Sequence, residues 1–180
     1  TDSIPALALG LEKPERNIMK RKPRDSKEGV FAGGMAFDVF YQGVLVTLLT
    51  LSAFFIGEYL ETGVFDIFHP VASGEGMTMA FLTMSMCEIF HSFNMRSQRA
   101  SVLGMTFVQG SHNWVLYGAM VASLALTTAI IEIPALANMF DFTHLDLKAY
   151  AISIGLAFLV IPIVEIIKAV QRAIDKKKNA

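Results

Sequence analysis

Two carboxylates stand in apolar surroundings, where a charged side chain is costly unless it has a partner or a ligand. Asp2 lies three residues ahead of Pro5 in an otherwise apolar stretch, and Glu88 lies near the middle of the apolar run 77–95. An acidic side chain inside a bilayer costs roughly 2.5–3.5 kcal/mol and normally faces a cavity or a partner. Carboxylates, hydroxyls and backbone carbonyls are the ligands that hard cations such as Ca²⁺ prefer. Asp2 and Glu88 are therefore candidate cation ligands.

Pro5 strengthens the case for Asp2. Proline lacks an N–H and its ring clashes with the carbonyl four residues back, so a helix is loosened where Asp2 sits. In a membrane, freed carbonyls beside a carboxylate are tolerated only where they face a cavity or an ion path. Thr1 adds a hydroxyl next to Asp2. Glu88 has a second interpretation, in which a protonated or hydrogen-bonded carboxyl only holds helices together.

Composition predicts that these residues are carried by membrane helices. Of the 180 residues, 53% are apolar and 17% are charged, whereas soluble domains carry about 25% charge. About 20 apolar residues cross a hydrocarbon core. We therefore expect an all-α membrane protein in which the end of one transmembrane helix, residues 1–10, is followed by four spans. The four predicted spans cover residues 35–57, 77–95, 112–131 and 147–168.

The distribution of basic residues gives the orientation. Lys and Arg are concentrated in the loop 11–34, with seven, in 96–111, with two, and in the last residues 168–180, with five. The loop 58–76 has none and 132–148 has only Lys148. The positive-inside rule then puts both ends of the chain in the cytoplasm. We expect a basic cytoplasmic loop at 11–34, a four-helix transmembrane bundle at 35–168 and a basic cytoplasmic tail at 169–180.

Small residues indicate where the helices approach one another. Gly33, Gly34 and Gly43 stand at or near the start of the first full span and are small enough to admit a neighbouring helix. We therefore expect close helix packing at these three glycines.

The first 24 residues carry a specific resemblance. The pattern Thr-Asp-x-x-Pro-Ala-x-Ala-Leu-Gly at residues 1–10, followed by Pro14, Ile18-Met19 and Pro23-Arg24, resembles the sixth transmembrane helix and following loop of P-type cation-transporting ATPases. The closest resemblance is to calcium pumps of the sarcoplasmic-reticulum type. It continues through Met77-Thr78-Met79-Ala80 and Glu88 to Arg96, and more loosely to the C-terminus.

This resemblance implies roles for the candidate ligands. In such pumps the Asp of the Thr-Asp pair coordinates the transported ions, and its Thr neighbour and a Glu of the eighth helix complete one site. The matching residues are Asp2, Thr1 and Glu88, with Ca²⁺ as the transported ion and protons carried in return. The chain would then hold the end of helix six and helices seven to ten. Its partners would be the lipid bilayer, with the plasma membrane expected, and the remainder of the same pump.

The sequence also lacks the motifs that such pumps use to hydrolyse ATP. It has no Asp-Lys-Thr-Gly-Thr, no Thr-Gly-Glu-Ser and no Gly-Asp-Gly-Val-Asn-Asp, and no P-loop. We therefore expect no catalytic residue and no cofactor site in this chain. ATP and Mg²⁺ would bind a preceding part of the pump, and the chain alone would be inactive.

Two alternatives stay open at this point. The ligands in this chain are only part of a set and do not separate Ca²⁺ from Mn²⁺. The ion could also be Na⁺ and K⁺, because the basic stretch 18–24 is also similar to the sodium–potassium branch of the family. A complete four-span scaffold or channel protein is the rival from another functional class. The upstream reading frame distinguishes that rival from a pump.

Overall fold

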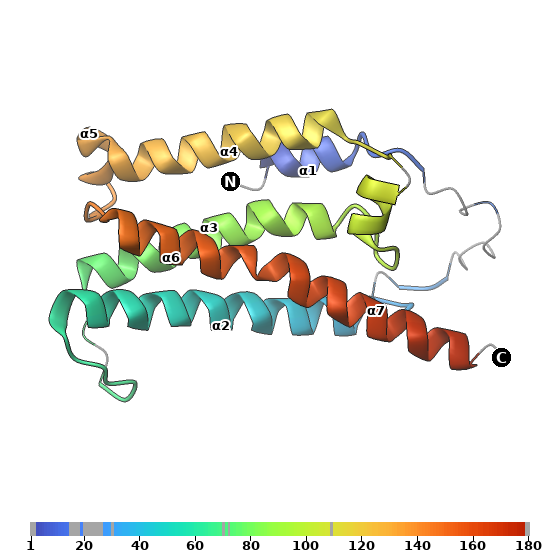
Figure 1. Ribbon diagram of the computed structural model, residues 1–180, viewed down its shortest axis with the longest axis horizontal. Helices are drawn as coiled ribbons and strands as arrows, with labels where there is room; N and C mark the ends of the chain where they lie inside the picture. The colour runs from blue at the N-terminus through green and yellow to red at the C-terminus, as the bar shows by residue number, and fades with distance from the viewer. Residues whose placement is uncertain are drawn as a thin grey trace.

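A computed structural model describes residues 3–14, 19, 27–29, 31–69, 71, 73–108 and 110–178. Thr1 and Asp2, two of the three predicted ligands, lie outside the described residues. Figure 1 shows an elongated bundle in which the long helices run side by side. The described elements are all helical, namely α1 (Ser3–Leu9), α2 (Met35–Thr62), α3 (Gly74–Asn94), the π-helical turn η2 (Gly104–Val108), α4 (Trp114–Glu132), α5 (Pro134–Ala137), α6 (Leu147–Phe158) and α7 (Val160–Lys178).

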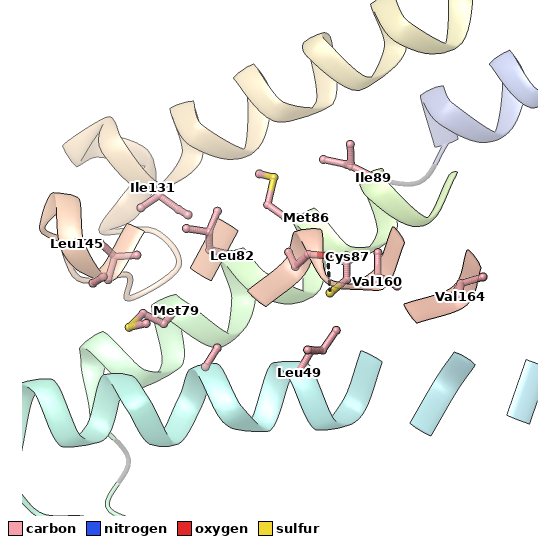
Figure 2. Packing of buried hydrophobic residues seen from close by; sticks show 13 residues of the cluster. Leu49, Met79, Leu82, Met86, Cys87, Ile89, Ile131, Leu145, Val160 and Val164 are labelled. Atoms are coloured by element: carbon pink, nitrogen blue, oxygen red, sulfur yellow. Dashed lines mark hydrogen bonds between the residues drawn. The ribbon is translucent and has the colours of Figure 1, made fainter. Parts of the chain in front are cut away.

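α3 is the centre of the bundle. It packs against α1, α2, α4, α6 and α7, so that other helices surround it on most sides. Its residues Met79, Leu82 and Met86 are fully buried in the core that α3 shares with α2, α4, α6 and α7 (Figure 2). Polar residues of α3 are buried as well, among them Thr83 and Ser85. A helix enclosed in this way need not be apolar all round.

The outer faces of α2 and α4 are apolar although they are exposed. Phe40 of α2 is 70% exposed and Val121 of α4 is 67% exposed. In the described part of the chain, three helical stretches are long and apolar enough to cross a membrane: Met35–Thr62, Trp114–Glu132 and Leu147–Asp175. Exposed apolar bands on such long helices are the surface that lipid would cover. The predicted all-α membrane architecture is confirmed at this level.

The predicted span 77–95 does not meet the same standard. It is a helix of 21 residues, α3, and so has the required length, but its polar side chains lower its mean hydropathy, and it is not among the three apolar stretches. The structure thus supports three of the four predicted spans by length and composition.

The predicted span 147–168 is a helix with a break. α6 ends at Phe158 and α7 begins at Val160, and the stretch is apolar enough to span as a unit. Pro162 explains the break, because it has no N–H for the carbonyl of Phe158 four residues earlier. At the break the backbone hydrogen bond reaches three residues back instead of four, with the amide of Leu159 donating to the carbonyl of Leu156 at 3.1 Å.

The loops divide between the two ends of the bundle. The C-terminus and the connection between α3 and α4 lie at one end, and α5 and the connection between α2 and α3 lie at the other (Figure 1). The first end therefore holds Arg96, Arg99 and the basic end of α7, and the second holds the described acidic residues of the two loops there. This arrangement agrees with the orientation that the Lys and Arg counts predict.

The close approach of helices occurs at glycines other than the predicted ones. A Cβ on Gly57 of α2 would lie 2.6 Å from the Cα of Gly76 of α3, so these two residues let the backbones meet. Gly33 and Gly34 instead adopt positive φ angles of 67° and 85° in the turn before α2. A Cβ on Gly43 would meet none of the described atoms within 4 Å. The prediction of close packing at Gly33, Gly34 and Gly43 was wrong.

Candidate ion-binding site and its supporting junction

α1 begins at Ser3, one residue after the predicted ligand Asp2. Pro5 and Ala8 form the buried side of α1. Ala8 packs in a small core with Leu116 and Ala119 of α4. α1 is thus anchored to α4 by apolar contact, and it also packs on α3.

Glu88 lies on α3 and is half-buried. In the described residues, no three His, Cys, Asp or Glu side chains come close enough to hold a metal ion. A site around Glu88 with three acidic, histidine or cysteine ligands would therefore draw some of them from outside these residues. Asp2, the predicted acidic ligand, is one of the residues outside the described part of the chain.

A polar stripe continues from Glu88 along α3. Nε2 of His91 is 3.1 Å from Oε1 of Gln42 on α2. Nδ2 of Asn94 lies 3.4 Å from Nδ1 of His91 and donates to the carbonyl of Val160 at 3.2 Å. The i, i+3, i+6 spacing that the sequence shows thus forms one face, and that face connects α3 to α2 and α7.

Ser3 on α1 and Glu88 on α3 lie at similar distances from the ends of their helices. Ser3 lies six residues before Leu9, the last residue of α1, and Glu88 lies six residues before Asn94, the last residue of α3. At 1.5 Å per residue, each is about 9 Å from the end of its helix. Both helices run toward the same end of the bundle in Figure 1.

The two helix ends meet at a buried polar junction, which we call the Glu12 junction; it consists of Glu12, Arg96 and Asn113. The Arg96 side chain is fully buried and holds the Glu12 carboxylate by two bonds, Nη2 to Oε1 at 2.8 Å and Nε to Oε2 at 3.1 Å. Nδ2 of Asn113 donates to Glu12 Oε2 at 2.9 Å and to the carbonyl of Ala8 at 3.0 Å. The junction thus binds the last turn of α1 directly.

The junction also orders the connection between α3 and α4. Arg96 Nη1 donates to Oγ1 of Thr106, in the π-helical turn, at 2.9 Å, and Nη2 donates to the carbonyl of Ser111 at 2.7 Å. Asn113 caps α4 by accepting from the amide of Leu116 at 3.0 Å. Burial alone would raise the pKa of Glu12, but the hydrogen bonds from Arg96 and Asn113 and the charge of Arg96 outweigh it and lower that pKa. The carboxylate form is therefore favoured at neutral pH.

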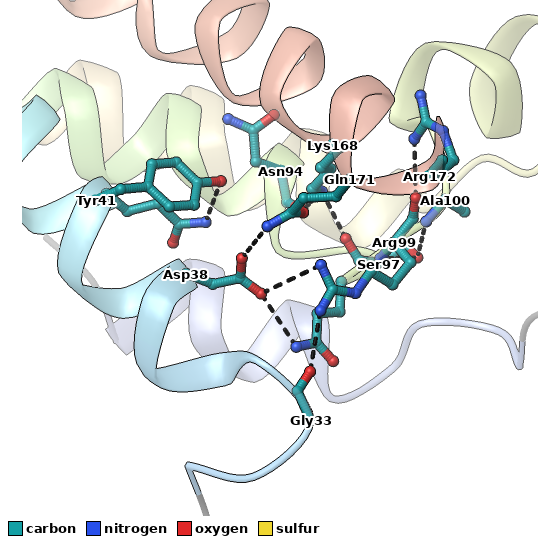
Figure 3. A network of polar contacts seen from close by, with 12 residues as sticks. Gly33, Asp38, Tyr41, Asn94, Ser97, Arg99, Ala100, Lys168, Gln171 and Arg172 are labelled. Carbon is teal, nitrogen blue, oxygen red and sulfur yellow. Dashed lines mark hydrogen bonds and ion pairs between the residues drawn. The ribbon is translucent and has the colours of Figure 1, made fainter. Parts of the chain in front are cut away.

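A second polar network, centred on Asp38 and Arg99, ties α2 to α7 (Figure 3). The buried Asp38 accepts from Nε2 of Gln171 at 2.7 Å and from Nε2 of Gln98 at 3.2 Å. Nη2 of Arg99 donates to the carbonyl of Gly33 at 2.9 Å, and Nη1 of Arg172 donates to the carbonyl of Arg99 at 2.8 Å. This Asp38 network contains no residue of α1.

Lys168 is a further buried charge at this end of the bundle. It is 3% exposed, and its Nζ donates to the carbonyls of Asn94 and Ser97, each at 2.5 Å. Carbonyls at the end of a helix favour a cation. Lys168 therefore fixes α7 to the end of α3.

Comparison with known proteins gives the family. The chain matches the family described as "Cation transporting ATPase, C-terminus" over residues 1–170. This chain belongs to the P-type cation-transporting ATPases. It corresponds to their C-terminal membrane region.

The relatives in this family are described as calcium transporters. The chain is 33% identical to calcium-transporting ATPase 1 of Bacillus cereus over 179 residues, which cover 96% of this chain and 20% of the relative. It is 34% identical to a calcium-transporting ATPase of Listeria monocytogenes, covering 97% and 18%. An endoplasmic reticulum-type calcium-transporting ATPase of Arabidopsis thaliana is 27% identical, covering 96% and 19%. The chain spans about a fifth of the length of these relatives.

The sequence identified Glu88 as a candidate cation ligand but did not indicate the Glu12 junction. Glu12 stood among basic residues of a loop, and Arg96 stood among the few charges after a predicted span. Their partnership joins positions 84 residues apart. The one available signal was that an arginine follows directly on the stripe of Glu88, His91 and Asn94, which is too general to predict a partner.

Proposed function

We propose that this chain is the C-terminal transmembrane part of an ATP-driven Ca²⁺ pump. In this proposal Asp2, Thr1 and Glu88 contribute ion ligands, and the remaining ligands come from the rest of the pump. The observation that carries the proposal is the matching depth of Ser3 and Glu88 on two helices that pack together. It allows Asp2, the residue before Ser3, to approach Glu88 from the neighbouring helix.

The helix equivalence forms part of the proposal. α1 is the end of helix six, α2 is helix seven, α3 is helix eight, α4 is helix nine, and α6 with α7 is helix ten. α3 then crosses the membrane although it is less apolar than its neighbours. Its enclosure by other helices supports this assignment, because polar groups in a bilayer are tolerated where they face the protein interior.

Ca²⁺ is the proposed substrate because the similar proteins are described as calcium-transporting, and because carboxylate and hydroxyl oxygens suit it. Glu88 is the proposed carrier of the counter-transported proton. A carboxylate inside a bilayer is costly as a lone charge, so a proton taken up in place of the released cation would remove that charge. Release of the ion would then be followed by proton uptake at the same group.

The proposal is tested in the full-length protein through phosphorylation by ATP. Asp2→Asn should abolish ion-dependent phosphorylation, because the residue would contact every transported ion. Glu88→Gln keeps the shape and removes one charge, so it should weaken the apparent Ca²⁺ affinity and reduce the pH dependence of ion binding. An unchanged affinity and pH dependence in Glu88→Gln would make Glu88 a packing residue.

The identity of the ion is decided by the same assay with different salts. Phosphorylation should depend on micromolar Ca²⁺ and should not be supported by Na⁺ or K⁺. Activation by Mn²⁺ at lower concentrations than Ca²⁺ would replace calcium with manganese as the substrate.

A further inference from the structure

We propose that Arg96 is a positioning residue for ion binding, which acts by fixing the place of α1 along the bundle axis through the Glu12 junction. This inference rests on the proposed function of Asp2 and Glu88 as ligands. It assigns a role to a pair that lies about 9 Å or more along the helices from those ligands. Arg96 therefore contacts no ion and acts through Glu12.

The Glu12 junction restrains α1 against movement along the bundle axis. Glu12 and the carbonyl of Ala8 belong to the segment that ends α1, while Arg96 follows the end of α3 and Asn113 caps α4. The four hydrogen bonds among these groups span 2.8 to 3.1 Å. An axial shift of α1 against α3 by 1 Å or so would stretch them beyond good geometry.

Among the described residues, the other side-chain contact at this end of α1 is apolar. The apolar contact of Ala8 with Leu116 and Ala119 is a contact of small or smooth side chains, which resists separation more than sliding. Charge-assisted, bidentate bonds from an arginine to a carboxylate are strong and directional. The junction is therefore the element that sets the axial register between Ser3 and Glu88.

Ca²⁺ coordination depends on the axial position of α1. Ca²⁺ takes its oxygen ligands at 2.3–2.6 Å, so a shift of about 1 Å in one helix removes a ligand from the coordination shell. Loss of the junction should thus weaken ion affinity while the bundle, which is held by the core around α3, stays assembled.

The Asp38 network supplies a matched control. Arg99, like Arg96, lies in the connection between α3 and α4 and bonds to a carboxylate and a backbone carbonyl. Its partners Asp38 and Gly33 belong to α2 and the turn before it. Arg99→Ala therefore removes an arginine–carboxylate contact without releasing α1, although its 3.9 Å ion pair is longer than that of Arg96.

The experiment measures the Ca²⁺ concentration for half-maximal phosphorylation by ATP in the full-length protein carrying Arg96→Ala, Arg96→Lys, Glu12→Gln or Arg99→Ala. We expect an increase of about tenfold or more for Arg96→Ala and Glu12→Gln, and a smaller one for Arg96→Lys, which keeps the charge but loses the bidentate geometry. Arg99→Ala should remain within about twofold of the wild type. The double variant of Glu12 and Arg96 should be no worse than Arg96→Ala alone, because both changes break one interaction.

Thermal stability separates positioning from folding. The inference is overturned if Glu12→Gln raises the half-maximal Ca²⁺ concentration no more than Arg99→Ala does. It is also overturned if the half-maximal Ca²⁺ concentration of each variant rises in proportion to its loss of thermal stability. Should Arg96→Ala fail to fold, the nearly isosteric Glu12→Gln decides the matter. Asp2→Asn is measured in parallel. If it retains normal Ca²⁺ dependence, the proposed function fails; if it abolishes phosphorylation and Glu12→Gln has no effect, only the positioning role fails.

Discussion

The contact between Gly57 and Gly76 makes a quantitative prediction about how α2 packs on α3. A Cβ at Gly57 would lie 2.6 Å from the Cα and 2.9 Å from the N of Gly76. Carbon atoms pack without repulsion at about 3.5–4.0 Å, so Gly57→Ala requires the two backbones to separate by roughly 1 Å. Because the opposing atoms are backbone atoms, no side-chain rotation can relieve the contact.

The cost follows from overpacking, which is typically about 1–3 kcal/mol. Gly43→Ala is the matched control, since it is also inside α2 and its new methyl group meets none of the described atoms within 4 Å. Both changes share the helix-propensity gain of up to about 1 kcal/mol. Gly57→Ala should therefore be less stable than Gly43→Ala by about 1–3 kcal/mol.

Cys87 offers a direct assay for this difference. Its side chain is fully buried, and its Sγ lies 4.0 Å from the carbonyl of Ala157 on α6. In full-length protein whose other cysteines have been replaced, a thiol-reactive dye should label Cys87 on heating only once the packing around α3 opens. Labelling should begin at a lower temperature in Gly57→Ala than in Gly43→Ala. Equal transition temperatures would refute the inference that these two backbones meet.

Three further predictions concern charge, orientation and activity. The lowered pKa of Glu12 stabilises the fold above the unfolded-state pKa, near the ordinary glutamate pKa of 4.5, and that contribution is lost as the pH falls through the lowered folded-state pKa. The difference in unfolding free energy between wild type and Glu12→Gln should therefore shrink below about pH 4.5; a constant difference would contradict the pair. With Cys87 replaced, a cysteine at the exposed Asn138 should react with an impermeant reagent added outside, whereas one at Ser101 should not, and the reverse pattern would invert the topology. Purified residues 1–180, free of host pumps, should not hydrolyse ATP. Measurable hydrolysis would contradict the assignment of the phosphorylation and nucleotide sites to other parts of the pump.

The helices were predictable where local pattern decides them. Apolar length indicated α2 and α4, and the prediction 77–95 falls close to α3, which runs from Gly74 to Asn94. Pro162 stood in the predicted fourth span, but the position of the break, at Leu159, is seen only in the backbone hydrogen bonds of the structure. The extent of α2 to Thr62, beyond the predicted end at residue 57, includes the buried Glu58, which an apolarity criterion leaves out.

The contacts between helices could not be predicted from the sequence in the same way. Which glycines meet depends on how two helices face each other, so Gly57 and Gly76 were not distinguishable from Gly43 by type. Glu12 and Arg96 each resemble ordinary loop charges, and only the folded chain joins them. Glu88 was identifiable because a carboxylate in an apolar helix is costly wherever its neighbours lie.

Equilibrium binding of radioactive Ca²⁺ to the full-length protein, without ATP, tests the central claim most directly. Wild-type protein should bind Ca²⁺ at micromolar concentrations, Asp2→Asn should abolish this binding, and Glu88→Gln should weaken it by about tenfold or more. Thr83→Val, on the same helix but on the face that contacts Ser153 of α6, should leave the affinity unchanged and serves as the control. Unaltered Ca²⁺ binding in both Asp2→Asn and Glu88→Gln would contradict the claim that this chain supplies ligands to the transported ion.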